Sequence, residues 1–217
     1  MATYTLVIGN KNYSSWSLRP WLALRVAEIA FEELIIPLDE PTTREEILKH
    51  TGSGRVPVLK SGDLRVWDSL AICEYLAETH PDVGLWPAAP AALAVARAVS
   101  AEMHAGFTAL RAAMPMNIRS RFPGRGRGPG VQDDINRITA IWRRCRERFG
   151  AGGAFLFGDF TIADAMFAPV VARFVTYEVE VGADEAAYMA AIGALPAMRD
   201  WAAAAEREPW IIDSAEF

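Results

Sequence analysis

The stretch Arg55-Val56-Pro57-Val58-Leu59 places a proline inside a run of β-forming residues. Proline has no backbone N–H to donate to a sheet, so it belongs at an edge strand, a bulge or a cis turn. A cis bond between Val56 and Pro57 would turn the backbone N–H and C=O of Val56 outward, where an extended peptide could pair with them like an added strand. An ordinary edge-strand proline is the alternative, and this stretch taken alone favours it.

The sequence around this stretch predicts an α/β unit with the element order βαβαββα. Short β-rich runs bounded by turn residues indicate the strands, and apolar residues at helical spacing indicate the helices. Thr43 and Glu46 have the spacing of a capping box, which favours a helix start there. Strands are expected at residues 5–9, 31–37, 55–60 and 64–67, and helices at residues 17–30, 43–50 and 68–79.

The pattern changes to helices alone in the second part of the chain. Residues 81–90 hold three prolines and a glycine, which is typical of a linker. An apolar stripe from Leu93 to Leu110 predicts one continuous helix, and the arginine- and glycine-rich residues 119–130 predict a loop. Further helices are expected at residues 135–149, 162–177, 185–192 and 195–207. We therefore expect two domains, residues 1–80 and residues 91–217, joined by the linker 81–90.

The composition of the 217-residue chain argues against several classes of protein. Its net charge of −5 and pI near 5.3 do not suit a nucleic-acid or anionic-membrane binder, because phosphate binding needs a cationic surface. Its apolar runs end well before the roughly 20 residues of a membrane span, and no basic segment indicates a secretory signal. Cys73 and Cys145 lie in separate helical patterns without metal-ligand spacing, so we expect neither a disulfide nor a metal site. The absence of a disulfide framework favours a cytoplasmic location.

Two further residues, Asp68 and Ser69, stand at the start of the last helix predicted in the α/β unit. A helix N-terminus presents unpaired N–H groups and a partial positive charge, so it attracts carboxylates. Either residue could instead simply cap its own helix. Each signal is weak by itself, and their combination with the Val-Pro pair is what carries information.

Together, the element order, the Val-Pro pair and the Asp-Ser pair resemble the N-terminal domain of the cytosolic glutathione S-transferases. The resemblance implies a thioredoxin-like domain followed by an all-helical domain, with glutathione as co-substrate. It implies that Val56, before a cis Pro57, pairs with the cysteinyl backbone of glutathione. Asp68 and Ser69 would hold the γ-glutamyl carboxylate and amine, and Arg55 would approach the glycyl end. Family members usually carry Glu where Asp68 stands.

A thiol near its reference pKa of about 8.5 is only slightly ionised at neutral pH, so such an enzyme must stabilise the thiolate. A hydroxyl donor and a helix N-terminus both do so. The stretch Ser14-Ser15-Trp16-Ser17-Leu18-Arg19 resembles the Ser-x-x-x-x-Arg pattern of serine-type zeta and tau transferases, which implies that Ser14 is this donor. Ser15 and Tyr13 are close enough to compete, and simple helix capping is the alternative. Trp16 replaces the cysteine of zeta and omega members, which argues against thiol exchange and a strict zeta isomerase.

In the helical half, Gly158-Asp159-Phe160-Thr161-Ile162-Ala163-Asp164 gives Thr161 and Asp164 the spacing of a capping box. This resembles the structural motif that begins a buried helix in the same family. Tyr13, His104, Phe107 and Arg111 could border a pocket for the second substrate, although core packing is favoured for Phe107.

The resemblance implies a homodimeric transferase in which the glutathione thiolate attacks a hydrophobic electrophile. A glutathione-dependent isomerase of the maleylacetoacetate type or a dehalogenase is the first alternative. A binding protein of the same fold without catalytic activity is the second.

Overall fold

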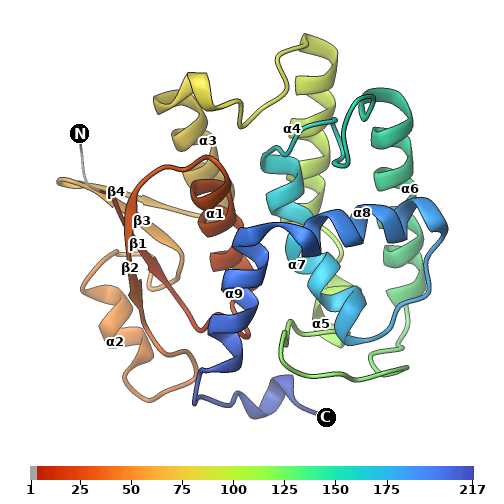
Figure 1. Ribbon diagram of the computed structural model, residues 1–217. Helices are drawn as coiled ribbons and strands as arrows, with labels where there is room; N and C mark the ends of the chain where they lie inside the picture. Colours follow the sequence, from red (N-terminus) through yellow and green to blue (C-terminus); the bar gives the residue numbers. More distant parts are fainter. Residues whose placement is uncertain (1–3) are drawn as a thin grey trace.

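The computed structural model describes residues 4–217, and its first part is a four-stranded sheet flanked by helices (Figure 1). The strand order is β2-β1-β3-β4, with β1 parallel to β2 and antiparallel to β3, and β3 antiparallel to β4. The order along the chain is the predicted βαβαββα. Its elements are β1 (Tyr4–Ile8), α1 (Ser15–Val26), β2 (Phe31–Ile35), α2 (Thr43–Leu48), β3 (Val58–Ser61), β4 (Leu64–Trp67) and α3 (Ser69–Thr79).

The two faces of the sheet bury different residues because side chains alternate along a strand. Leu6 and Ile8 of β1 belong to the large core that also contains α1 and α3, whereas Val7 packs with Ile47 of α2 in a smaller core. In Figure 1, α1 and α3 accordingly lie between the sheet and the helical part, with α2 on the opposite side. The beginning of α1 is therefore placed at the junction of the two parts.

The second part of the chain is helical, apart from two isolated β-bridges near residues 155–159. Helix α7 is almost completely buried and packs on α1 and α4. Across residues 4–217, no helix combines the length and the apolar character needed to cross a bilayer. The elements are a 3-10 turn (Pro81–Val83), α4 (Pro90–Ala105), α5 (Thr108–Ala113), α6 (Val131–Phe149), α7 (Ile162–Thr176), α8 (Ala183–Ala194), α9 (Pro196–Glu206) and a last 3-10 turn (Asp213–Ala215).

The helix predicted to run continuously through residues 93–110 is in fact two helices. It ends at Ala105, and the chain turns at Gly106 and Phe107 before α5 begins. Phe107 has a positive φ of 56°, and a Cβ at Gly106 would lie 2.8 Å from the Glu102 carbonyl oxygen. The buried residues Met103, Phe107 and Leu110 keep helical spacing across the break, so the apolar periodicity hid the turn.

Two details of the α/β part also differ from the sequence prediction. The third strand begins at Val58 rather than residue 55, because the Val56–Pro57 bond is cis and the chain joins the sheet only after it. Thr43 and Glu46 do not form a capping box. Instead, the Thr43 hydroxyl donates to the Pro37 carbonyl, and Glu46 pairs with Lys49.

Candidate functional site

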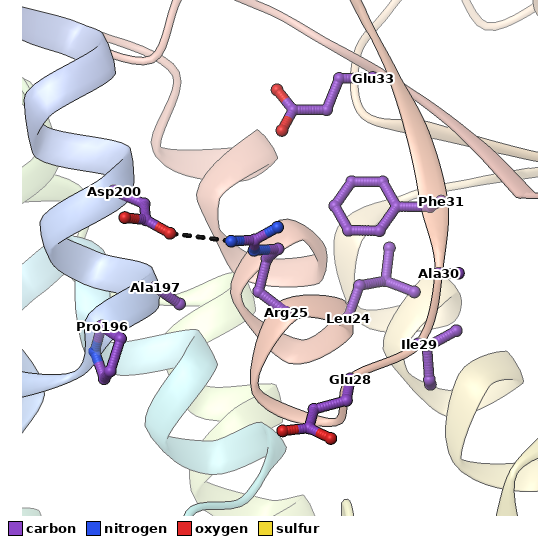
Figure 2. A pocket seen from close by; sticks show the side chains of 10 residues that line it. All are labelled: Leu24, Arg25, Glu28, Ile29, Ala30, Phe31, Glu33, Pro196, Ala197 and Asp200. Carbon is purple, nitrogen blue, oxygen red and sulfur yellow. Dashed lines mark hydrogen bonds and ion pairs between the residues drawn. The ribbon is translucent and has the colours of Figure 1, made fainter.

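A cavity of about 660 Å³ lies where the sheet part meets α4 and α5. The segment before β3, the β4–α3 junction, α1, α4 and α5 all contribute to it, and we call it the main cavity. A second hollow of about 460 Å³ lies elsewhere, between α1, β2 and α9, and contains none of the predicted site residues (Figure 2). The main cavity brings together seven residues that the sequence singled out: Arg55, Val56, Pro57, Asp68, Ser69, His104 and Arg111.

Asp68 is held in an unusual conformation at the start of α3. Its φ of 75° is uncommon for a residue with a side chain. One carboxylate oxygen accepts the N–H groups of Leu70 and Ala71 at 2.9 and 3.3 Å, so Asp68 is the cap of its own helix. The other oxygen lies 3.0 Å from Nε2 of His104, and the side chain remains 44% exposed. The residue therefore both caps α3 and presents a negative charge to the main cavity.

Ser69 and His104 each carry a buried polar atom without a partner. The Ser69 hydroxyl, in a residue that is 1% exposed, has no hydrogen-bond partner among residues 4–217, and neither has Nδ1 of His104. Unpaired buried polar groups are rare, and these two line the main cavity, where a ligand could supply the missing partners. Burial is the main cause that lowers the pKa of His104, with Asp68 opposing it and Arg19 and Arg111 adding to it. At neutral pH the ring is therefore neutral, with Nε2–H donating to Asp68.

The two serines of the predicted thiol site face in different directions. Ser14 is the N-cap residue of α1 and is 5% exposed, and its Oγ lies 2.7 Å from Oγ of Ser17. Ser17 also accepts the N–H of Gly9 at 3.1 Å. Ser15 instead lines a neighbouring hollow of about 360 Å³, where its hydroxyl accepts from Nη2 of Arg173 at 3.3 Å. In the structure the Ser14 hydroxyl donates to Ser17. If the Ser17 hydroxyl turns to donate to Ser14 instead, the Ser14 proton becomes available to a ligand.

Two arginines lie against Trp16, which lines both the main cavity and this neighbouring hollow, and a third, Arg173, lines the neighbouring hollow with it. The guanidinium carbons of Arg19 and Arg111 lie 4.3 and 4.5 Å from the centre of the Trp16 ring. Arg19 is 2% exposed, and within the described chain its Nε and Nη1 have no partner. Burial, then the charges of Arg173 and Arg111, lower the pKa of Arg19 to about 9. Burial likewise lowers the pKa of Arg173 to about 10. Both remain cationic at neutral pH, so the region attracts anions.

The structure does not bring Ser14, Tyr13 or Phe107 to the lining of either hollow. The Tyr13 hydroxyl donates to Glu216 at 2.7 Å and accepts from Arg119, and Phe107 is packed in the core at 7% exposure. Conversely, sequence reasoning did not assign site roles to Ser53, Trp67 and Arg173. For Arg173 a signal existed, since it is the single basic residue of the mostly apolar helix α7.

The capping box predicted for Thr161 and Asp164 is present at the start of α7. Oδ2 of Asp164 accepts the N–H and the hydroxyl of Thr161 at 2.8 and 3.0 Å, and Oδ1 accepts the N–H of Leu156 at 3.1 Å. Its contribution is to the stability of the helix that carries Arg173.

Comparison with known proteins agrees with this architecture. The sequence patterns of the glutathione S-transferase N-terminal and C-terminal domains match residues 13–79 and 129–204. A maleylacetoacetate isomerase of Rhizobium meliloti is 32% identical over 178 residues, which cover 78% of this chain and 82% of that protein. A probable maleylacetoacetate isomerase of Caenorhabditis elegans is 26% identical over 162 residues, or 73% of each chain.

Solved structures agree at the level of the fold. A glutathione transferase homolog from Burkholderia gl BGR1, crystallised with bound glutathione, has a TM-score of 0.72 at 22% identity and covers 94% of this chain and 98% of its own. The four-stranded sheet, the helical second part and both sequence patterns thus coincide in one protein. The chain belongs to the glutathione S-transferase family.

Proposed function

We propose that the protein is a glutathione-dependent transferase, with glutathione in the main cavity and its thiolate attacking an electrophile. One observation carries this proposal: Val56, Pro57, Asp68 and Ser69 converge on one cavity with an unpartnered Ser69 hydroxyl. The Asp68 carboxylate faces the γ-glutamyl ammonium, and the Ser69 hydroxyl donates to the adjacent carboxylate. The backbone of Val56 pairs with the cysteinyl residue, and Arg55 attracts the glycyl carboxylate.

The thiol then lies at the N-terminus of α1. The positive end of the helix and the hydroxyl of Ser14 both favour the thiolate over the thiol. A chain of hydrogen bonds supports the choice of Ser14. The Gly9 N–H donates to Ser17, which in the structure also accepts from Ser14. When glutathione binds, Ser17 would turn to donate to Ser14, and Ser14 would donate to sulfur. Each donor in such a chain polarises the next, which strengthens the last hydrogen bond.

The replacement of Asp68 by asparagine tests the glutathione site. Asparagine keeps the size, tolerates a positive φ and caps a helix equally well, so the fold should be retained. It removes only the charge that pairs with the ammonium. Since a hydrogen bond to a charged group contributes about 1.5–3 kcal/mol, glutathione affinity should fall by about 10- to 100-fold in calorimetric titration.

The matched control is Asp63→Asn, an exposed acid in the turn before β4. Its affinity for glutathione should equal that of the wild type. Wild-type protein that binds no glutathione would refute the proposed function, and equal affinity in Asp68→Asn would remove Asp68 from the site.

Glutathione binding should also weaken in acid because of His104. Its pKa is lowered by burial, so the ring is neutral at pH 7 and becomes protonated only below its ordinary range. The imidazolium would then compete with the ammonium of glutathione for the same Asp68 carboxylate. We expect affinity to fall by up to about tenfold as the pH decreases from about 7 to about 5, measured by calorimetry.

The variant His104→Gln replaces the ring N–H with an amide donor that cannot take up a proton. Its affinity for glutathione should therefore not change between about pH 7 and about pH 5. His50→Gln, at a histidine that does not line the main cavity, should keep the wild-type pH profile. A His104→Gln profile as steep as that of the wild type would show that another group is responsible.

A second candidate function is the isomerisation of an unsaturated acid, as in the relatives named maleylacetoacetate isomerases. The observation that favours it is the group of cationic arginines that lie against Trp16 or line the neighbouring hollow with it, since none of Arg19, Arg111 and Arg173 forms an ion pair within residues 4–217. Such a lining suits an anionic substrate better than an apolar one. The thiolate would add to the double bond, allow rotation, and leave again, so that glutathione is regenerated.

Titration of free thiol separates the two candidates. An aryl halide is consumed together with one equivalent of thiol if the enzyme is a transferase. Maleylacetoacetate is converted with no loss of thiol if it is an isomerase. The ratio of the two rates identifies the better substrate class.

A further inference from the structure

We propose that Glu208 is a positioning residue, which holds the loop between β1 and α1 so that Ser14 meets the glutathione sulfur. This inference rests on the proposed function. The loop comprises residues 9–14, and we call it the β1–α1 loop. Glu208 lies two residues beyond the end of α9, about 200 positions away along the chain.

The Glu208 carboxylate joins the β1–α1 loop to the segment that follows α9. One oxygen accepts the N–H of Lys11 at 2.6 Å, and the other accepts the N–H of Asn12 at 2.9 Å. Lys11 is 7% exposed and Asn12 is fully buried, so these N–H groups cannot turn to bulk water. A buried backbone donor requires a partner, and this single side chain supplies one to each of two consecutive residues.

Further contacts of Lys11 join the β1–α1 loop to helix α9. The indole N–H of the buried Trp201 donates to the Lys11 carbonyl at 2.8 Å. Nζ of Lys11 lies over the rings of Trp21 and Trp201, 5.0 and 5.3 Å from their centres, and pairs with Glu33 at 2.6 Å. Figure 2 shows Glu33 above α1, with α9 alongside. These contacts hold helix α9 against the β1–α1 loop and α1, and Glu208 follows shortly after α9 in the sequence.

Residues beyond Glu208 hold the rest of the β1–α1 loop. Arg119 donates to the carbonyls of Glu208 and Trp210, each at 2.9 Å, and to the Tyr13 hydroxyl at 2.8 Å. The Tyr13 hydroxyl in turn donates to Glu216. Lys11, Asn12 and Tyr13 are therefore all fixed by the C-terminal segment, and Ser14 is the next residue.

This placement matters because the hydrogen bond from Ser14 to sulfur depends on distance. A displacement of 1 Å at a catalytic group can cost as much as 100-fold in rate. The groups proposed to bind glutathione lie on other elements, before β3 and at the start of α3. Loosening the β1–α1 loop should therefore affect ionisation of the thiol far more than binding of the peptide.

The test is Glu208→Gln, which keeps the shape of the side chain but leaves only one acceptor for two N–H groups. Bound thiolate is measured by its ultraviolet absorbance against pH, and turnover and affinity are measured on the same protein. We expect the pKa of the bound thiol to rise by about one unit and kcat to fall about tenfold, with KM for glutathione within about twofold. Simple removal of a negative charge would instead lower that pKa, so the sign separates positioning from electrostatics.

Glu206→Gln is the matched control, since this exposed side chain on the last turn of α9 has no hydrogen bond or ion pair within the described chain. It should behave as the wild type. Glu208→Asp retains both acceptor oxygens and the charge on a shorter side chain, so it should recover part of the lost turnover. It also serves as the second variant if Glu208→Gln does not fold.

Wild-type protein without a thiolate signal overturns the proposed function and this inference with it. A normal wild-type signal together with an unchanged or lowered thiol pKa in Glu208→Gln overturns this inference alone. The same holds for Glu208→Asp if Glu208→Gln is insoluble.

Discussion

Replacement of Ser14 by alanine is expected to lower kcat by about 10- to 100-fold, which is the largest effect on activity that we foresee. The variant loses the donor that stabilises the thiolate, so the pKa of bound glutathione returns towards about 8.5. Affinity for glutathione should change by less than about threefold, because Val56, Asp68 and Ser69 are untouched. Steady-state kinetics and thiolate absorbance against pH would measure both effects.

Ser15→Ala is the natural comparison, since it removes an identical group one residue away. We expect it to reduce kcat by less than about threefold in the aryl halide reaction, because its hydroxyl faces Arg173 rather than the Ser14–Ser17 pair. The opposite ranking of the two variants would transfer the role of thiolate donor to Ser15.

The largest effect on stability is expected for Asp164→Ala. Asp164 is fully buried, and burial raises the pKa of its carboxyl to about 6 while hydrogen bonds from Leu156 and Thr161 oppose the rise. Alanine would leave the buried N–H groups of Thr161 and Leu156 without acceptors, and would thereby remove the Asp164 half of the capping box of α7. Each such group contributes about 1–3 kcal/mol, so we expect a loss of about 2–4 kcal/mol in the free energy of unfolding.

For a chain of this length that loss corresponds to a decrease in Tm of roughly 5–15 °C, measurable by calorimetry. Asp159→Ala, an exposed acid five positions earlier in the same segment, should change Tm by no more than about 2 °C. A similar Tm for Asp164→Ala and the wild type would mean that the carboxylate does not contribute to stability as its three hydrogen bonds suggest.

Local signals in the sequence were sufficient for the order of strands and helices. Strand alternation and helical spacing located each element of the α/β part, and the capping box at Thr161 and Asp164 was found from its spacing alone. The turn at Gly106 and Phe107 was not predicted, because the spacing of buried residues continues through it from Met103 to Leu110.

Long-range contacts are the part of the candidate site that the sequence could not predict. The Val-Pro and Asp-Ser pairs were recognisable, and the structure brings them to one cavity. The contact of Ser15 with Arg173, and that of Lys11 with Glu208, join residues 158 and 197 positions apart. No spacing rule connects such residues, since their proximity is decided by the packing of α1 against α7 and α9.

The attachment of the C-terminal segment to the β1–α1 loop has a consequence for synthesis of the chain. A protein emerges from the ribosome N-terminus first, and early parts can begin to fold before later ones exist. Residues 9–14 are made long before the side chain that accepts the N–H groups of Lys11 and Asn12, because Glu208 lies about 200 positions further along the chain. The nascent sheet therefore forms before these N–H groups have their acceptors, and a product that stops before Glu208 would fold with an incomplete β1–α1 loop.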